Sequence, residues 1–259
     1  MKFAHISDMH LLNEGALINE VDPAKNLAKA LKDIFKNHPK MKFITMTGDL
    51  TQNGDLESYE TLARVIKASP IPIFPIIGNH DKRKNFWKFF PKQRNGKYVQ
   101  YTKVFNNRAF IFLDSVKEGV HSGHMDKDRF EWLEEKLKKY QNKDIYLFMH
   151  HHPVFVDMPP MDNLYNFKSA HKFWKIVTKY PNVKHIFFGH LHRNFDGRHK
   201  GIGLSSVNST SFQIAYTPNE EQEYLILDEP PTYSIVKIKK HTFKIHTTTF
   251  LKDKNKKLL

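Results

Sequence analysis

The chain has 259 residues, of which 40% are hydrophobic, so it can bury a substantial core within one large α/β domain. It contains no cysteine, which excludes disulfides and thiolate metal sites. Lysine and arginine number 41 against 27 acidic residues, and the net charge of +14 suits anionic partners, nucleic acid among them. Because the lysines are spread along the chain rather than clustered, we give this charge little weight.

The chain shows no feature of a secreted or membrane protein. Polar residues arrive almost at once in its first ten residues, MKFAHISDMH, which leaves no apolar segment for a cleavable signal. No stretch approaches the roughly 20 apolar residues that a membrane helix needs. We therefore expect a cytoplasmic protein without a membrane partner. No linker or repeat divides the chain, so we also expect a single domain over residues 1–250 and a basic, frayed tail over residues 251–259.

Short apolar runs alternate with amphipathic helical patterns through most of the chain. In chain order we expect a strand at 2–7, a helix around 27–35, a strand at 43–47, a helix around 59–66, strands at 73–77 and 109–113, a helix around 130–137, a strand at 145–149, a helix around 173–177 and a strand at 185–188. This alternation is typical of βαβ units. After Gly197, alternating runs at 233–238 and 242–248 predict a late antiparallel hairpin that closes a second sheet.

Residues with metal-ligand chemistry directly follow five of the expected strands. They are Asp8 and His10, Gly48-Asp49, Gly78-Asn79-His80-Asp81, His150, and Gly189-His190-Leu191-His192. Because sites in α/β sheets are built at the carboxyl ends of the strands, we expect these side chains to meet at one edge. Carboxylates, an amide and imidazoles suit Mn, Fe, Zn or Co better than Ca. The glycines before the ligands indicate sharp turns or close backbone approaches.

In this order the motifs D-x-H, G-D, G-N-H-(D/E), H and G-H-x-H resemble those of the calcineurin-like metallophosphoesterases, over roughly residues 1–250. The resemblance implies an α/β fold, a four-layer αββα sandwich of two mixed β-sheets flanked by helices. It also implies two divalent or trivalent transition-metal ions and assigns their ligands: Asp8, His10 and His192 to the first, Asn79, His150 and His190 to the second, and Asp49 to both. His80 would be the catalytic residue, facing the leaving group without binding metal.

The same resemblance implies a mechanism. Two cations about 3.5–4 Å apart would clamp the phosphoryl oxygens and generate a bridging hydroxide near neutral pH, which would attack phosphorus in line. His80 would donate a proton to the departing alkoxide or stabilise its charge. No covalent protein intermediate is needed, which agrees with the absence of a cysteine and of a G-x-S-x-G motif.

Differences among the family's branches bear on the substrate. Phosphoprotein phosphatases carry G-D-x-x-D-R-G, whereas this chain reads GDLTQNG over residues 48–54 and lacks the acid and arginine that suit a monoester dianion. The segments 5–11 and 149–153 resemble those of small bacterial phosphodiesterases, and the chain is most similar to the class III 3′,5′-cyclic nucleotide phosphodiesterases. We therefore expect a metal-dependent phosphoric diester hydrolase acting on a small anionic phosphodiester, with 3′,5′-cyclic AMP as the first candidate substrate.

The sequence leaves three alternative functions open. Glycerophosphodiester phosphodiesterases share nearly all of these motifs. A nuclease would suit the positive charge, but no basic and aromatic stripe supports it, so nucleic acid is not favoured as a partner. A non-catalytic scaffold of the same fold would usually lack a ligand, and none is missing here. A homo-oligomer is left open.

The other polar residues have simpler interpretations. We expect His151 to lie behind the ligands, His152 to be ambiguous, and Asp81 and Asp114 to be structural. Pocket-lining residues are expected from loops at 13–22, 154–166 and 194–197, without a residue assigned to the substrate. The remaining histidines are expected at the surface or in the core, outside the site: His5, His38, His121, His124, His171, His185, His199, His241 and His246.

Overall fold

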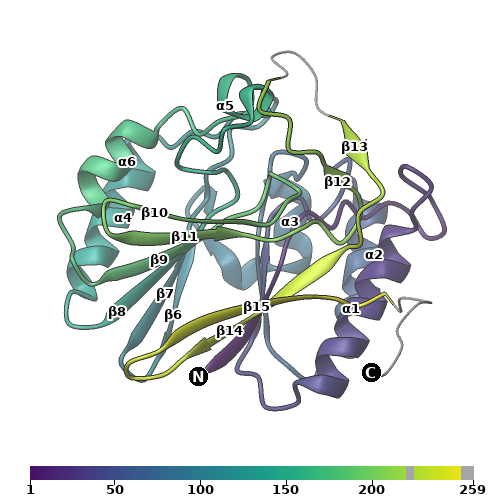
Figure 1. Cartoon of the computed structure of the whole chain (residues 1–259), viewed down its shortest axis with the longest axis horizontal. Coiled ribbons are helices and arrows are strands. Elements are labelled where there is room, and N and C mark those ends of the chain that lie inside the picture. The colour runs from purple at the N-terminus through teal and green to yellow at the C-terminus, as the bar shows by residue number, and fades with distance from the viewer. Residues whose placement is uncertain (220–224, 252–259) are drawn as a thin grey trace.

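The computed structural model of the chain describes residues 1–219 and 225–251, and two β-sheets form its centre (Figure 1). The first sheet has the order β15 (Phe243–Thr249), β14 (Thr232–Ile238), β1 (Lys2–Ile6), β2 (Ile44–Thr47) and β3 (Ile73–Ile76). The second has the order β10 (Phe195–His199), β11 (Ile202–Ser206), β9 (Val183–Phe187), β8 (Asp144–Phe148), β7 (Arg108–Phe112) and β6 (Tyr101–Phe105). Both sheets are mixed. Parallel pairing joins β1, β2 and β3 in the first sheet and β11, β9, β8 and β7 in the second, while β15, β14 and β1, β10 and β11, and β7 and β6 pair antiparallel.

Two short strand pairs and seven helical segments complete the described part of the chain. The pairs are β4 (Arg94–Asn95) with β5 (Tyr98–Val99), and β12 (Gln213–Ile214) with β13 (Ile226–Leu227). The helical segments are α1 (Pro23–Asn37), α2 (Leu56–Ile66), α3 (Arg83–Phe89), the 3₁₀ turn η1 (Pro91–Gln93), α4 (Lys127–Lys139), α5 (Pro159–Asn163) and α6 (Ala170–Val177). None of the described helices is both long and apolar enough to cross a membrane.

Aromatic side chains fill the space between the two sheets. Phe3 stacks on Phe43 at a ring distance of 4.7 Å, and the edge of Phe187 meets Phe3 at 5.4 Å. Phe148 stacks on Phe187 at 5.0 Å, so rings from both sheets interdigitate. Each fully buried phenylalanine stabilises the fold by about 1.5–3 kcal/mol relative to an exposed one.

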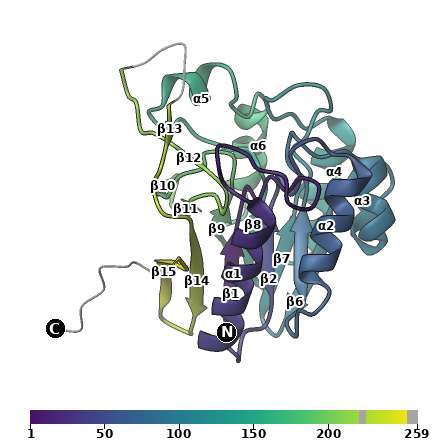
Figure 2. The same cartoon turned by 90° about the vertical axis from the view of Figure 1, so that its right-hand side faces the viewer.

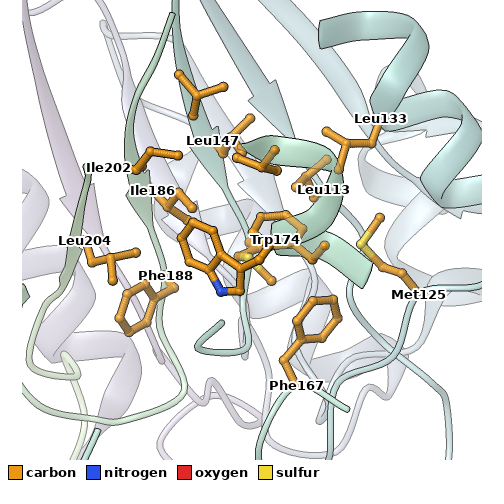
Figure 3. Packing of buried hydrophobic residues seen from close by; sticks show 14 of the residues in the cluster. Leu113, Met125, Leu133, Leu147, Phe167, Trp174, Ile186, Phe188, Ile202 and Leu204 are labelled. Atoms are coloured by element: carbon orange, nitrogen blue, oxygen red, sulfur yellow. The ribbon is translucent and has the colours of Figure 1, made fainter. Parts of the chain in front are cut away.

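Helices cover the outer face of each sheet, which gives four layers (Figure 2). α1 illustrates the cause: Asp22 caps its first turn, Pro23 begins it, and Leu27, Leu31 and Ile34 fall at helical spacing and are buried against the first sheet. On the second sheet, the side chains of α4 and α6 pack with strand residues around Trp174 (Figure 3). The predicted αββα sandwich of two mixed sheets is therefore confirmed.

The predicted strands are present with boundaries within about two residues of the structure, and each predicted helix is present but begins three or four residues earlier than expected. One placement was wrong: the late hairpin β14–β15 does not close the second sheet but pairs with β1 in the first. Strands β6, β10 and β11 were not predicted, because their runs are short or interrupted by glycine and charge. The predicted basic tail falls largely on residues 252–259, outside the described residues, and the single domain over 1–250 stays a prediction.

Candidate metal centre

Strained backbone turns bring the predicted ligands to the carboxyl edge of the strands. Five of these ligands adopt positive φ angles that non-glycine residues rarely take, namely Asp8 (55°), His10 (48°), Asp49 (45°), His190 (71°) and His192 (49°). Such conformations cost of order 1–3 kcal/mol each and persist where the surrounding structure enforces them, which is characteristic of functional sites. The strained turns after β1, β2 and β9 therefore direct these side chains toward one another.

Glycines make room for this convergence. Gly48 has φ of 92°, and a Cβ atom there would lie 2.5 Å from Nδ1 of His150. A Cβ atom on Gly78 would collide with the carboxylate of Asp49. The expected reasons for these glycines, a positive φ angle and a close approach, are both present.

The first ligand group consists of Asp8, His10, Asp49 and His192, all buried. One ligand atom from each of the four lies within 4.8 Å of the others. Nε2 of His10 is 2.9 Å from Nε2 of His192 and 3.6 Å from Oδ2 of Asp49. Oδ1 of Asp8 lies 3.8 Å from Nε2 of His192.

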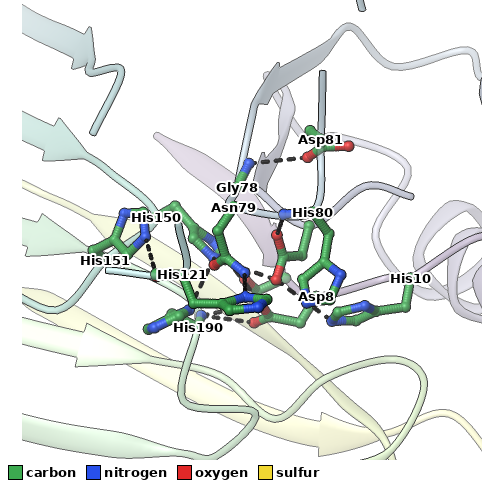
Figure 4. A network of polar contacts seen from close by, with 12 residues as sticks. Asp8, His10, Gly78, Asn79, His80, Asp81, His121, His150, His151 and His190 are labelled. Atoms are coloured by element: carbon green, nitrogen blue, oxygen red, sulfur yellow. Dashed lines mark hydrogen bonds and ion pairs between the residues drawn. The ribbon is translucent and has the colours of Figure 1, made fainter. Parts of the chain in front are cut away.

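The second group consists of Asn79, His150 and His190 (Figure 4). Nε2 of His150 lies 3.2 Å from Nδ1 of His190 and 3.0 Å from Oδ1 of Asn79. Oδ2 of Asp49 is 3.4 Å from the same Nε2 of His150. This single carboxylate oxygen thus reaches both groups, at the place that the bridging assignment requires.

The tautomers of the four histidines can be read from their outer hydrogen bonds. Each donates its other ring nitrogen to an oxygen acceptor: His10 to Gln52 Oε1 at 2.6 Å, His150 to the Thr47 carbonyl at 2.8 Å, His190 to the Tyr165 carbonyl at 2.9 Å and His192 to the Phe212 carbonyl at 2.9 Å. In its neutral form each ring therefore directs the lone pair of its inner nitrogen into the cluster, an arrangement that a cation stabilises. The His/Asp cluster fits a dinuclear metal site.

Charge interactions in the cluster keep Asp49 ionised. Burial alone would raise the pKa of Asp49, but His150 and His80 bring it well below its usual value. Burial would likewise lower the pKa of His150, yet Asp49 and Asp8 raise it to about 9. Without a metal ion, an extra proton on His150 offsets the carboxylate. A bound cation would take the place of that proton, so metal binding and proton release are coupled.

The neighbouring polar residues hold the ligands. Both ring nitrogens of His151 are used, with Nδ1 2.8 Å from Ser115 Oγ and Nε2 3.0 Å from the His121 carbonyl, so it lies behind the ligands as expected. Asp81 accepts hydrogen bonds from the backbone of Gly78 and the hydroxyl of Tyr59, which fixes the loop.

Neither Asp114 nor His152 belongs to the two ligand groups. Asp114 forms a two-pronged pair with Arg83 at 2.7 and 2.8 Å, in the structural role expected of it. His152 is buried, its ring stacked at 5.8 Å on His190, and it does not line the cavity at the two groups.

A cavity of about 150 Å³ opens over the two groups. His80 lines it, and Nδ1 of His80 donates to the Gln52 carbonyl at 2.9 Å, which leaves Nε2 for a bound ligand. Among the described residues, no lysine or arginine lines this cavity. Its apolar part is made by four side chains: Met161, Tyr165, Phe212 and Ile214.

Several cavity residues differ from expectation. Of the three predicted loops only 154–166 contributes, while 13–22 and 194–197 lie elsewhere. His121 was placed outside the site, which is wrong: it lines the cavity and contacts Asn79. Gln52 and Phe212 were missed as well. Gln52 follows Asp49 by three residues and could have been suspected, whereas Phe212 and His121 carry no local signal.

Comparisons with known proteins agree with this geometry. A family model described as Calcineurin-like phosphoesterase matches residues 1–194. A probable cyclic nucleotide phosphodiesterase from Rhodopseudomonas palustris is 31% identical over 98% of this chain and 94% of that protein. A probable glycerophosphodiester phosphodiesterase from Arcobacter nitrofigilis is 29% identical over 91% of this chain and 88% of its own length.

Solved structures show the same fold. A dimetal phosphatase from Danio rerio superposes with a TM-score of 0.72 over 96% of each chain, at 11% identity. The resemblance drawn from the motifs, including the likeness to cyclic nucleotide phosphodiesterases, is confirmed. So is the prediction of a metal-dependent phosphoric diester hydrolase. The ordered motifs, the two converged ligand groups and these matches together establish that the chain belongs to the calcineurin-like phosphoesterase family.

Proposed function

We propose that the chain is a dinuclear metal-dependent phosphodiesterase whose first metal ion is held by Asp8, His10 and His192. Asn79, His150 and His190 hold the second ion, and Asp49 bridges the two. The position of Asp49 Oδ2, 3.6 Å from His10 and 3.4 Å from His150, is the observation that carries this assignment. When bound, two such cations supply Lewis-acid activation of the phosphate and a water of lowered pKa for in-line attack. Manganese is the first choice, with Fe, Zn and Co as alternatives that the donor set also accepts.

His80 acts on the leaving group. Its Nδ1 is committed to the Gln52 carbonyl, so the ring is fixed and Nε2 is the atom that faces a ligand. A proton carried at Nε2 passes to the departing oxygen as the ester bond breaks. Its backbone amide also donates to Oδ1 of Asp49 at 2.9 Å, which leaves Oδ2 directed at the two groups.

The cavity favours a diester. A monoester dianion needs more compensating positive charge than a diester monoanion, and the described lining offers no lysine or arginine for it. Phe212 and Tyr165 instead provide apolar surface suited to an esterified alcohol. Relatives named as cyclic nucleotide phosphodiesterases support 3′,5′-cyclic AMP as the first substrate to test. The relative named as a glycerophosphodiester phosphodiesterase makes that diester class the second candidate.

A hydrolysis panel on the metal-reconstituted protein tests the substrate. We expect 3′,5′-cyclic AMP to be cleaved with a higher kcat/KM than glycerophosphocholine or single-stranded DNA. If cyclic AMP were inert and glycerophosphocholine were cleaved rapidly, the proposed substrate would change to a glycerophosphodiester, and the proposed two-metal chemistry would stand. Preferred cleavage of DNA would support the nuclease instead. The cytoplasmic location and the oligomeric state stay predictions.

A further inference from the structure

We propose that His121, which lies outside every predicted metal-binding motif, is a positioning residue that holds the Asn79 carbonyl toward the second metal ion. The inference rests on the proposed two-metal centre and is independent of which phosphodiester the protein cleaves. His121 belongs to the loop between β7 and α4, far in sequence from Asn79 and from the other ligands of that group.

The contact that carries the proposal is between two side chains. Nδ2 of Asn79 lies 3.0 Å from Nδ1 of His121, while Oδ1 of Asn79 lies 3.0 Å from Nε2 of His150 (Figure 4). The amide nitrogen is the donor, so Nδ1 of His121 accepts. A carboxamide can present either end after a half-turn, and only its oxygen binds a metal ion. The bond to His121 selects the orientation in which that oxygen faces the group.

Asn79 needs such a partner more than the other ligands do. It is the one neutral, non-imidazole ligand proposed for the second ion, and it is only partly buried. Each histidine ligand is oriented by a carbonyl or amide oxygen on its outer nitrogen. His121 gives Asn79 the corresponding outer contact, and the loss of an outer partner of this kind typically weakens metal binding by about 10–100-fold.

Buried groups hold the His121 loop in place. Nε2 of His151 donates to the backbone carbonyl of His121 at 3.0 Å, and Ser115 Oγ occupies the opposite nitrogen at 2.8 Å. Gly123 permits this packing, because a Cβ atom there would lie 2.5 Å from Cγ of His151. The Gly123 amide also donates to the Asn166 carbonyl at 3.0 Å, which ties the loop to the segment before α6.

These contacts assign a supporting role to His151, the second histidine of the His150-His151 pair. His151 lies near both His150 and His190, yet both of its ring nitrogens are engaged elsewhere. Its neighbour His150 is itself a member of the second ligand group. His151 supports that group indirectly, through its contact with His121 and the contact of His121 with Asn79. The chain of contacts therefore runs from a buried histidine to an exposed one and on to the ligand.

Two substitutions of His121 separate its hydrogen bond from its bulk. In His121→Asn an amide oxygen can take the place of Nδ1, since both atoms are bonded to Cγ. His121→Leu fills similar space without an acceptor. His124→Leu is the matched control, because His124 is an exposed histidine of the same loop that bonds Ser169 and does not line the cavity.

Metal-free protein is titrated with Mn²⁺, and the electron paramagnetic resonance signal of free Mn²⁺ reports the unbound ion. We expect His121→Leu to bind the first Mn²⁺ normally and the second about 10–100-fold more weakly. His121→Asn and His124→Leu should bind both ions as the unmodified protein does. Unchanged binding of the first ion shows that each variant is folded.

Three results would overturn the role of His121: wild-type binding of both ions by His121→Leu, equal weakening of both steps, or a loss in His121→Asn as large as in His121→Leu. If the unmodified protein bound only one Mn²⁺, the two-metal proposal itself would fall and this one with it. Those outcomes are distinct, because the first three leave two-metal binding by the unmodified protein intact.

Discussion

At the scale of single residues, Asp49 has the position on which the centre depends. Its Oδ2 atom lies within 3.6 Å of a nitrogen from each ligand group. Asp8, the other carboxylate of the cluster, lies 3.8 Å from Nε2 of His192 but approaches His150 only at Nδ1, at 3.9 Å, and that nitrogen donates to the Thr47 carbonyl. Asp49 and its partners could be expected to meet because each motif stands at a strand end, while their roles as ligands were implied by the resemblance to the family. His121 could not be expected there, because only the folded loop brings it to Asn79.

Replacing Asp49 should therefore affect both metal ions. We expect Asp49→Ala to lose metal at both groups and to lose activity, whereas His192→Ala should lose the first ion alone, since Nε2 of His192 faces His10. Elemental analysis of the dialysed proteins measures this directly. Two tightly bound ions in Asp49→Ala would rule out the bridging assignment.

His80 should separate catalysis from metal binding. We expect His80→Ala to keep both ions while turnover falls roughly 10²–10⁴-fold, the usual scale for a general acid. The loss should be smaller for nitrophenyl esters, whose leaving groups need little protonation. An equal loss for good and poor leaving groups would indicate charge stabilisation rather than proton transfer.

At the scale of elements, the strand ends were predictable and the pairing of the late hairpin was not. Each ligand follows an apolar run of period two or a buried run, so β1, β2, β3, β8 and β9 could be located from local pattern. The hairpin β14–β15 has an equally clear pattern, but its partner β1 is fixed by packing across more than 200 residues. The local sequence of the hairpin therefore does not predict which strand it pairs with.

The turn after β3, which contains Gly78, leads to a prediction at the scale of elements. A methyl group on Gly78 would collide with the Asp49 carboxylate, so Gly78→Ala should displace the bridging ligand and weaken metal binding. Gly197→Ala is the control, because its Cβ would meet only the ring of Phe195 at 3.1 Å or more. Isothermal titration calorimetry of the two metal-free variants with metal ion compares their metal affinities. Equal affinity in both variants would show that the turn tolerates the added atom.

At the scale of the whole molecule, the two sheets bury histidines that have no part in the metal centre. His5 Nε2 bonds Thr47 Oγ1 at 2.8 Å, and His185 Nε2 bonds Ser205 Oγ at 2.8 Å. Burial, with the charge of His185 as a smaller cause for His5, lowers the pKa of each to about 3. From sequence both were expected outside the site, at the surface or in the core, and the structure places them in the core.

These two histidines should make the fold sensitive to acid. In the unfolded chain each titrates near its ordinary pKa of about 6.5, so between pH 6.5 and 3 the unfolded state binds more protons. Stability is therefore complete above pH 6.5 and falls as the pH is lowered through that window, by about 2 kcal/mol for each histidine at pH 5.

Urea unfolding at pH 7 and pH 5 measures this loss. His5→Gln and His185→Gln place an amide near Nε2 that does not titrate, so the double variant should lose less stability on acidification than the unmodified protein. Equal losses would show that other groups, such as the ligand histidines, account for the acid sensitivity.

In the proposed centre, Asp49 and the two ligand groups would hold two metal ions that activate a phosphodiester for hydrolysis. The most direct test adds Mn²⁺ to metal-free protein in steps and records kcat/KM for bis(4-nitrophenyl) phosphate and 4-nitrophenyl phosphate at each step. We predict that diester cleavage rises mainly as the second ion binds and exceeds monoester cleavage throughout. Full activity after a single ion, activity without metal, or a preference for the monoester would each contradict it.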